Sequence, residues 1–125
     1  MTSLPKIADS EWRIMKVLWK ESPKSAQEII DTLQGDINWT SKTIKTLLNR
    51  LVNKGALGYD KDGRSYLYYP LVEESACKKR ETQSFVNRVF DGALKPMLAA
   101  FLEDGKLTSE EIKELKRFLE NEGEE

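Results

Sequence analysis

Apolar residues recur at helical spacing in the first half of the chain. Over residues 9–20, Trp12, Met15 and Trp19 fall on one helical face, and either of the first two residues, an Asp and a Ser, suits the N-cap. A second helix is predicted to start at Ser25, because Glu28 follows it at the spacing of a capping box. The pattern therefore predicts two short helices before residue 35, where a glycine ends the second.

The third helical pattern, over residues 40–54, is the clearest in the chain. Thr40 or Ser41 suits its N-cap, and Gly55 is expected to end it. Its apolar residues lie at i, i+3, i+4 and i+7, which is the stripe of a helix with one buried face. That stripe consists of Ile44, Leu47, Leu48 and Leu51.

A β-hairpin is predicted next, over residues 57–69. Asp-Gly at 62–63 is a signal for a two-residue turn, and tyrosines favour the strands on both sides. With that turn, Lys61 faces Arg64 and Tyr59 faces Tyr66. Three helices followed by a two-stranded hairpin form a winged helix-turn-helix, in which the helix before the wing is the recognition helix. We assign this DNA-binding domain to residues 1–71.

The chain from residue 72 to 125 is predicted to form three further helices. They cover about 73–90, 93–103 and 108 onward, and the last starts with a second capping box at Thr108. Their apolar faces are too small to enclose a core alone, so we expect a dimerisation domain completed by a second copy of the chain. The alternative is packing against the N-terminal domain. The expected interface residues are Phe85, Val89, Phe90, Leu94, Met97, Leu98, Phe101, Leu102, Ile112, Leu115, Phe118 and Leu119.

The overall charge changes this picture only when it is divided between the two domains. The 125 residues carry a net charge of −1, which by itself argues against nucleic-acid binding. Residues 1–71 hold 11 basic and 8 acidic groups, however, whereas residues 72–125 hold 9 and 13. Because binding depends on where charges lie, the basic N-terminal half remains compatible with DNA.

The polar face of the third helix is the strongest functional signal. Residues 40–54 contain four basic residues and no acidic one, and the face opposite the apolar stripe is rich in Lys, Thr and Asn. Lys reads guanine or phosphate, Asn reads adenine, and Thr methyl groups contact thymine. Each residue alone is better explained as part of a solvated surface, whereas the set favours DNA. The expected DNA contacts are Ser41, Lys42, Thr43, Lys45, Thr46, Asn49 and Arg50, with Lys61 and Arg64 from the wing.

Composition excludes several other classes of protein. There is no His, which removes Ser-His-Asp and Cys-His catalysis, and the single cysteine, Cys77, permits no internal disulfide. No apolar run is long enough to span a membrane, and the first twenty residues lack the pattern of a signal peptide. We therefore expect a cytoplasmic, non-enzymatic protein without cofactor, metal or membrane insertion.

At several places the chain resembles the penicillinase-repressor (BlaI/MecI) family. Residues 9–19 resemble the family's opening helix, residues 39–57 its recognition helix over the whole length, and Gly63-Arg64 with Tyr66 and Tyr68 its wing. Residues 84–101 resemble its C-terminal part. The resemblance implies a homodimeric winged-helix repressor of palindromic operator DNA, with a cytoplasmic place of action and a role in antibiotic resistance.

The resemblance also implies a route of release. In the β-lactam-responsive members a membrane sensor metalloprotease cleaves the C-terminal lobe, and the matching bond here joins Ala100 to Phe101. Staphylococcal-type members carry Asn where this chain has Ala100. The copper-responsive branch carries a tail with two Cys-x-Cys pairs, which is absent from this sequence. Alternatives are a repressor that answers another signal, such as copper, and a winged helix that binds an acidic protein.

Overall fold

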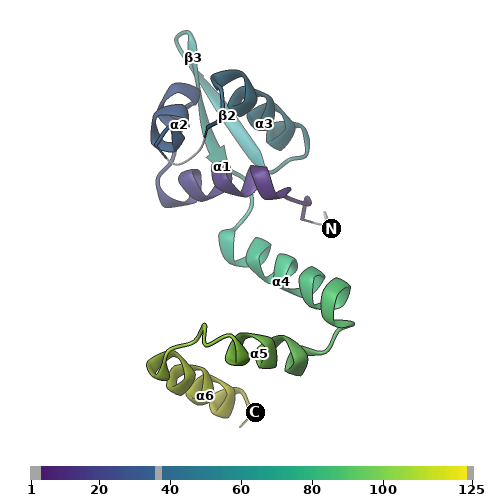
Figure 1. The fold of residues 1–125 in the computed structure, drawn as a ribbon. Coiled ribbons are helices and arrows are strands. Elements are labelled where there is room, and N and C mark those ends of the chain that lie inside the picture. Colours follow the sequence, from purple (N-terminus) through teal and green to yellow (C-terminus); the bar gives the residue numbers. More distant parts are fainter. Residues whose placement is uncertain (1–3, 36–37, 124–125) are drawn as a thin grey trace. The chain divides into compact units, whose positions relative to one another are not determined.

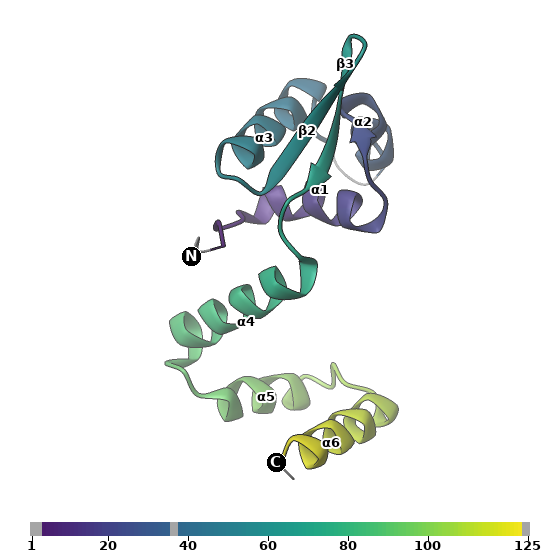
Figure 2. The ribbon, with the colours of Figure 1, turned by 180° about the vertical axis from the view of Figure 1, so that it is seen from behind.

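The computed structural model describes residues 4–35 and 38–123, and the chain divides into two compact units, Met1–Lys79 and Arg80–Glu125. The N-terminal unit contains a three-stranded antiparallel sheet in the order β1-β3-β2. Its elements are α1 (Asp9–Lys20), β1 (Lys24–Ser25), α2 (Ala26–Leu33), α3 (Ser41–Asn53), β2 (Leu57–Asp62) and β3 (Ser65–Pro70). Three helices gather around the base of a hairpin whose tip extends beyond them (Figures 1 and 2). The predicted winged helix-turn-helix is confirmed.

The predicted apolar stripe of α3 forms the centre of the core. All four of its residues are buried, and they pack with Ile14, Met15 and Leu18 of α1 and with Ile29 of α2. Trp12 and Trp19 lie at the edge of this core, half-buried, with ring centroids 5.6 Å apart. The Trp19 indole Nε1 donates to the backbone oxygen of Val72 at 3.0 Å, which ties the end of the wing to α1.

Local hydrogen bonds explain where the helices begin. Ser25 Oγ accepts from the Glu28 N–H at 3.2 Å while Glu28 Oε1 accepts from the Ser25 N–H at 3.0 Å, so the predicted capping box of α2 is confirmed. Thr40 Oγ1 accepts from the Thr43 N–H and caps α3. The predicted cap of α1 is wrong by one or two residues: the N-cap is Ala8, whose N–H donates to Glu11 Oε1 at 2.8 Å.

The hairpin differs from the prediction in its register. Lys61 pairs with Tyr66 and Tyr59 pairs with Tyr68, so the two turn residues are Gly63 and Arg64. Gly63 has a φ of +64°, which suits the first turn position of a type II′ hairpin, where glycine adopts this backbone at no steric cost. The turn is thus shifted by one residue, and Arg64 lies at its tip.

A short third strand was not predicted from the sequence. β1 has two residues, and it pairs with β3 through Lys24 with Tyr68 and Ser25 with Leu67. Two residues are too few to show a strand periodicity, and Ser25 also serves as the N-cap of α2. The wing is therefore anchored to the segment that connects α1 with α2.

One buried charge joins the ends of two helices. Glu11 is 1% exposed, and its Oε1 lies 2.6 Å from Lys54 Nζ, which also donates to the backbone oxygen of Lys6 at 2.9 Å. Lys54 is the C-cap residue of α3. A buried carboxylate is costly unless it is paired, so this ion pair holds the start of α1 against the end of the recognition helix.

The C-terminal unit consists of helices that bury little of their apolar surface within one chain. They are α4 (Glu74–Phe90), whose first part belongs to the N-terminal unit, α5 (Leu94–Glu103) and α6 (Ser109–Gly123). The predicted cap at Thr108 is confirmed, since its Oγ1 accepts from the Glu111 N–H at 3.1 Å. Among the described residues from Arg80 onward, only Val86 is buried.

Candidate nucleic-acid interface

The outward face of α3 is formed by the residues that the sequence predicted. Ile44, Leu47 and Leu48 point into the core, which turns the intervening polar side chains to the outside. All seven predicted contacts on this helix are exposed: Ser41, Lys42, Thr43, Lys45, Thr46, Asn49 and Arg50. The helix therefore presents a continuous polar surface with no acidic residue.

Two threonines on this surface have hydroxyl groups that are engaged within the helix. Thr46 Oγ1 donates to the Lys42 backbone oxygen at 2.9 Å, and Thr43 Oγ1 lies 3.0 Å from Thr40 Oγ1. Because the hydroxyl groups are turned to these partners, each side chain leaves its methyl group to meet a ligand. Methyl groups at such positions suit contact with the C5-methyl group of thymine.

A groove of about 430 Å³ runs between α2, α3 and the wing. It brings together three of the predicted residues, Lys45 and Asn49 from α3 and Arg64 from the turn of the hairpin. Lys61 is exposed on β2 but does not line this groove, and the other predicted residues of α3 lie outside it. The structure thus joins an ammonium, an amide and a guanidinium group in one recess.

Several lining residues of this groove were not predicted from the sequence. They are Ser25, Ala26 and Gln27 from the start of α2 and Ser65, Tyr66 and Tyr68 from β3. The capping box had located the start of α2, but only the tertiary fold brings that end beside α3. Hydrogen bonds with Ser25, first through its backbone N–H and then through its hydroxyl, lower the pKa of Glu28. The Glu28 carboxylate therefore completes the capping of α2 by accepting the Ser25 N–H.

Tyrosines cover one face of the wing beside the groove. The Tyr59 ring lies 4.9 Å from the Tyr66 ring and 6.1 Å from the Tyr68 ring, measured between centroids. Burial raises the pKa of the Tyr68 phenol, and its neighbours Tyr66 and Tyr59 raise it further. The Tyr68 phenol is therefore neutral at physiological pH. The exposed Tyr66 supplies a hydroxyl group and an apolar ring to the groove.

The positive charge of this surface is concentrated on α3. Among the described residues, Lys42, Lys45 and Arg50 have no ion-pair partner. On the wing, by contrast, Asp60 and Asp62 stand in the same strand as Lys61 and offset its charge. Exposed cations without a partner are suited to contact with a phosphate backbone.

The predicted interface and cleavage residues lie in the C-terminal unit. None of the twelve expected dimer residues is buried in the single chain, and Phe118 is 62% exposed. Ala100 and Phe101 are exposed residues of α5, and their backbone oxygens accept from the N–H groups of Asp104 and Lys106, each at 3.3 Å. The bond between them is therefore part of a helix.

Comparison with known proteins gives a consistent result along nearly the whole chain. The family model described as penicillinase repressor matches residues 7–121. The chain is 42% identical over 120 residues to the penicillinase repressor of Bacillus licheniformis, covering 96% of this chain and 94% of that protein. It is 37% identical over 113 residues to the methicillin resistance regulatory protein MecI of Staphylococcus aureus (strain N315), covering 90% and 92%.

The chain is also similar to a solved structure. The solution structure of the Bacillus licheniformis BlaI monomeric form in complex with the blaP half-operator matches with a TM-score of 0.53 and 44% identity. The match covers 60% of this chain and 92% of that one.

Within the described ranges, no helix has the length and apolar character that crossing a membrane would require.

Proposed function

The chain belongs to the penicillinase repressor family, whose members are transcriptional repressors and not enzymes, and from this premise we propose that it represses transcription by binding a palindromic operator as a homodimer. The recognition helix α3 enters the major groove, and the wing contacts the adjacent backbone. The observation that carries the proposal is the outward face of α3, with the amide of Asn49 and exposed cations that have no ion-pair partner in the described part of the chain.

The residues divide into those that read bases and those that position the helix. Lys45 and Asn49 lie in the groove on successive turns of α3, which suits contact with base edges. Ser41 and Lys42 at the start of α3, together with Arg50, suit contact with phosphate groups, as do Lys61 and Arg64 of the wing. The methyl groups of Thr43 and Thr46 suit contact with thymine. Specificity then resides in the central turns of the helix.

Dimerisation is proposed to occur through the C-terminal unit. Its exposed apolar residues include Phe85, Phe101 and Leu102, which are 40%, 47% and 51% exposed in the single chain. Such a surface is expected to be covered, and a symmetric pairing of two copies covers it with one interface. The pairing also supplies two recognition helices, which a palindromic operator requires.

Release from the operator is proposed to follow cleavage of the dimerisation unit by a sensor metalloprotease in response to a β-lactam-type signal. Cutting between Ala100 and Phe101 separates α6 and the end of α5 from the rest of the unit. The cut removes Phe101, Leu102 and the apolar face of α6 from the shared surface. Because a protease binds an extended segment, α5 has to unwind locally before the bond is accessible.

The test is the substitution Lys45→Ala, measured by operator binding in a gel-shift titration. If Lys45 reads a base, affinity for the operator falls by roughly 1–3 kcal/mol, and discrimination between operator and unrelated DNA falls with it. The matched control is Lys79→Ala, because Lys79 is also exposed but lies in α4, away from the groove.

Two outcomes would contradict this assignment. Unchanged operator affinity in Lys45→Ala would remove Lys45 from the interface. Equal affinity of the native protein for operator and unrelated DNA, at all salt concentrations, would favour a winged helix that binds an acidic protein instead.

A further inference from the structure

A second hollow of the N-terminal unit lies between α1, β1 and the end of α2. Its volume is about 650 Å³, larger than the groove beside α3. It shares no lining residue with that groove. Lys24 lines the hollow whereas its neighbour Ser25 lines the groove, because successive residues of a strand point to opposite faces. The hollow is therefore a site separate from the proposed DNA surface.

Basic residues dominate the charge of this hollow. Arg13, Lys16 and Lys20 stand on one face of α1, at spacings of three and four residues, and Lys24 joins them from β1. Asp9 and Glu21 are its acidic residues, so four cations face two carboxylates and two positive charges remain in excess. A ligand with two negative charges would neutralise the site.

The cations are poorly satisfied by the protein itself. Among the described residues, Arg13, Lys16 and Lys20 have no ion-pair partner. The Lys24 side chain is only 15% exposed, and its Nζ lies 3.9 Å from Glu21 Oε1, a carboxylate that is itself 79% exposed. An ammonium group on a largely buried side chain, with one distant and solvated partner, gains from a bound anion.

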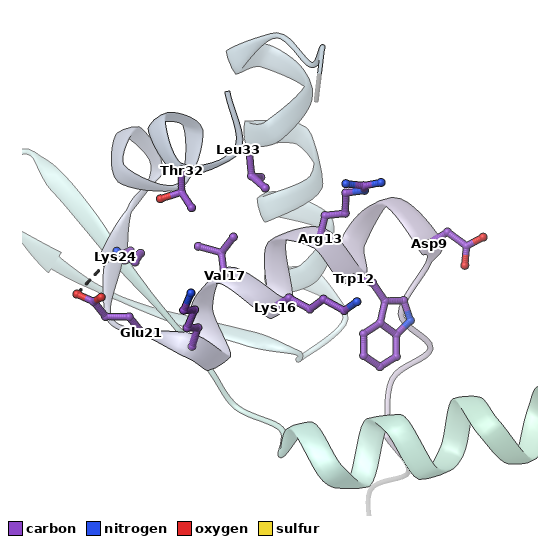
Figure 3. A pocket seen from close by; sticks show the side chains of 10 residues that line it. Asp9, Trp12, Arg13, Lys16, Val17, Glu21, Lys24, Thr32 and Leu33 are labelled. Carbon is purple, nitrogen blue, oxygen red and sulfur yellow. Dashed lines mark ion pairs between the residues drawn. The ribbon is translucent and has the colours of Figure 1, made fainter. Parts of the chain in front are cut away.

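The arrangement of side chains separates the charges. Val17 of α1 and Thr32 and Leu33 of α2 face the middle of the hollow (Figure 3). Arg13 and Lys16 lie toward one end, and Lys24 lies toward the other (Figure 3). The Trp12 side chain adds an aromatic ring at the Arg13 end. Apolar surface thus lies between two positively charged ends.

We propose that this hollow binds a small organic dianion whose two negative groups are separated by an apolar body. One anionic group contacts Arg13 and Lys16, the other contacts Lys24 and Lys20, and the body covers Val17 and Leu33. Carboxylate and phosphate groups share this chemistry, and the separation of the charges is the recognised feature. The site stands independently of the proposed operator binding, because no residue is common to both surfaces.

The experiment uses the full chain, labelled with ¹⁵N, and three probes followed by NMR titration. Terephthalate carries one carboxylate at each end of a benzene ring, its monomethyl ester has the same shape with one charge, and phenyl phosphate carries its charge at one end. Terephthalate is expected to shift the amides of residues 12–24 and the Trp12 indole saturably, and not the Trp39 indole. It should bind about tenfold more tightly than either other probe, as loss of one charged hydrogen bond predicts.

Variants test each end of the site. Lys16→Met and Lys24→Met each remove one ammonium group and keep the aliphatic stem, so terephthalate should then bind no more tightly than its monomethyl ester. Lys79→Met is the matched control and should retain the native preference. Amide spectra that are unchanged outside the hollow verify that the variants are folded.

Four results would overturn the proposal. Three are equal affinity for terephthalate and its ester in the native protein, tighter binding of phenyl phosphate, and an unaltered preference in Lys24→Met. The fourth is shifts of the α3 amides that match those of the α1 amides, which would reveal unspecific screening of basic residues.

Discussion

At the scale of single residues, position 58 requires a glycine because the Tyr69 ring on the paired strand lies too close for a side chain. A Cβ atom at Gly58 would lie 2.9 Å from the Cε2 and Cζ atoms of Tyr69, its partner on β3. Gly35 offers a contrast, because nothing lies within 4 Å of a Cβ built there. Glycine at position 58 therefore makes room for the Tyr69 ring.

The substitution Gly58→Ala is expected to destabilise the N-terminal unit by about 1–3 kcal/mol, because the Tyr69 ring has to move or the strands have to separate. Urea unfolding monitored by tryptophan fluorescence measures this change, with Gly35→Ala as the tolerated control. Combining Gly58→Ala with Tyr69→Leu should restore part of the lost stability. Equal stability of Gly58→Ala and the native protein would show that the ring yields at no cost.

The candidate site was predictable at this scale only in part. The exposed face of α3 followed from its own periodicity, since burying Ile44, Leu47 and Leu48 leaves their neighbours outside. The groove did not follow, because Ser25 and Tyr66 reach it from elements distant in sequence. The buried ion pair of Glu11 with Lys54 depends on a contact between residues 43 apart in sequence, which no local pattern reveals.

At the scale of elements, local capping signals were more informative than turn signals. Ser25 and Thr108 located their helices because a capping box specifies both its donors and its acceptors within four residues. The Asp-Gly signal placed the hairpin correctly but its turn one residue early, because pairing along the whole strand decides the register. Six paired positions between β2 and β3 outweigh the preference of one dipeptide.

The capping box of α2 predicts a specific dependence of stability on pH. Its hydrogen bonds with Ser25 hold the pKa of Glu28 below the ordinary value of 4.5, so the folded state prefers the ionised form. The resulting stabilisation is fully present above the unfolded pKa and is lost as the pH falls through the folded pKa. Glu28→Gln does not titrate and should lack this loss.

The measurement compares the free energy of unfolding of the native protein and Glu28→Gln between pH 7 and about pH 3, the range that includes the carboxylate titration. The advantage of the native protein over the variant is expected to shrink as the pH falls. All other carboxylates are common to both proteins and cancel in the difference. Parallel stability curves would contradict a role for the Glu28 charge in capping α2.

At the scale of the whole molecule, the two units differ in how much of their apolar surface they bury. Met1–Lys79 encloses a core that includes Ile14, Leu48 and Leu51 at 0% exposure. Arg80–Glu125 leaves Phe101, Phe118 and Leu119 exposed. Basic residues are in excess in the N-terminal half and acidic residues in the C-terminal half, so a net charge near zero describes neither. The proposed recognition of DNA and the proposed association of copies therefore use separate surfaces.

The dimer is tested by placing a charge in the exposed apolar surface. Phe101 is 47% exposed in the single chain, so Phe101→Asp should leave the fold of one copy intact. In a symmetric interface the substitution occurs twice, and losing two buried phenyl rings costs about 3 kcal/mol or more. In sedimentation equilibrium, the dissociation constant of the dimer is expected to rise by about 100-fold or more. Lys106→Asp, a neighbouring exposed position, is the control.

The same variant separates the two proposed surfaces when it is bound to DNA. Affinity for a half-operator should be unchanged, because α3 and the groove are untouched. Affinity for the full operator should fall, and its dependence on salt should weaken toward that of the half-operator, because each released phosphate contact contributes about −0.9 to the slope. A fully dimeric Phe101→Asp would exclude this helical face from the interface. A monomer that binds the full operator as tightly as the native protein would show that association contributes nothing to repression.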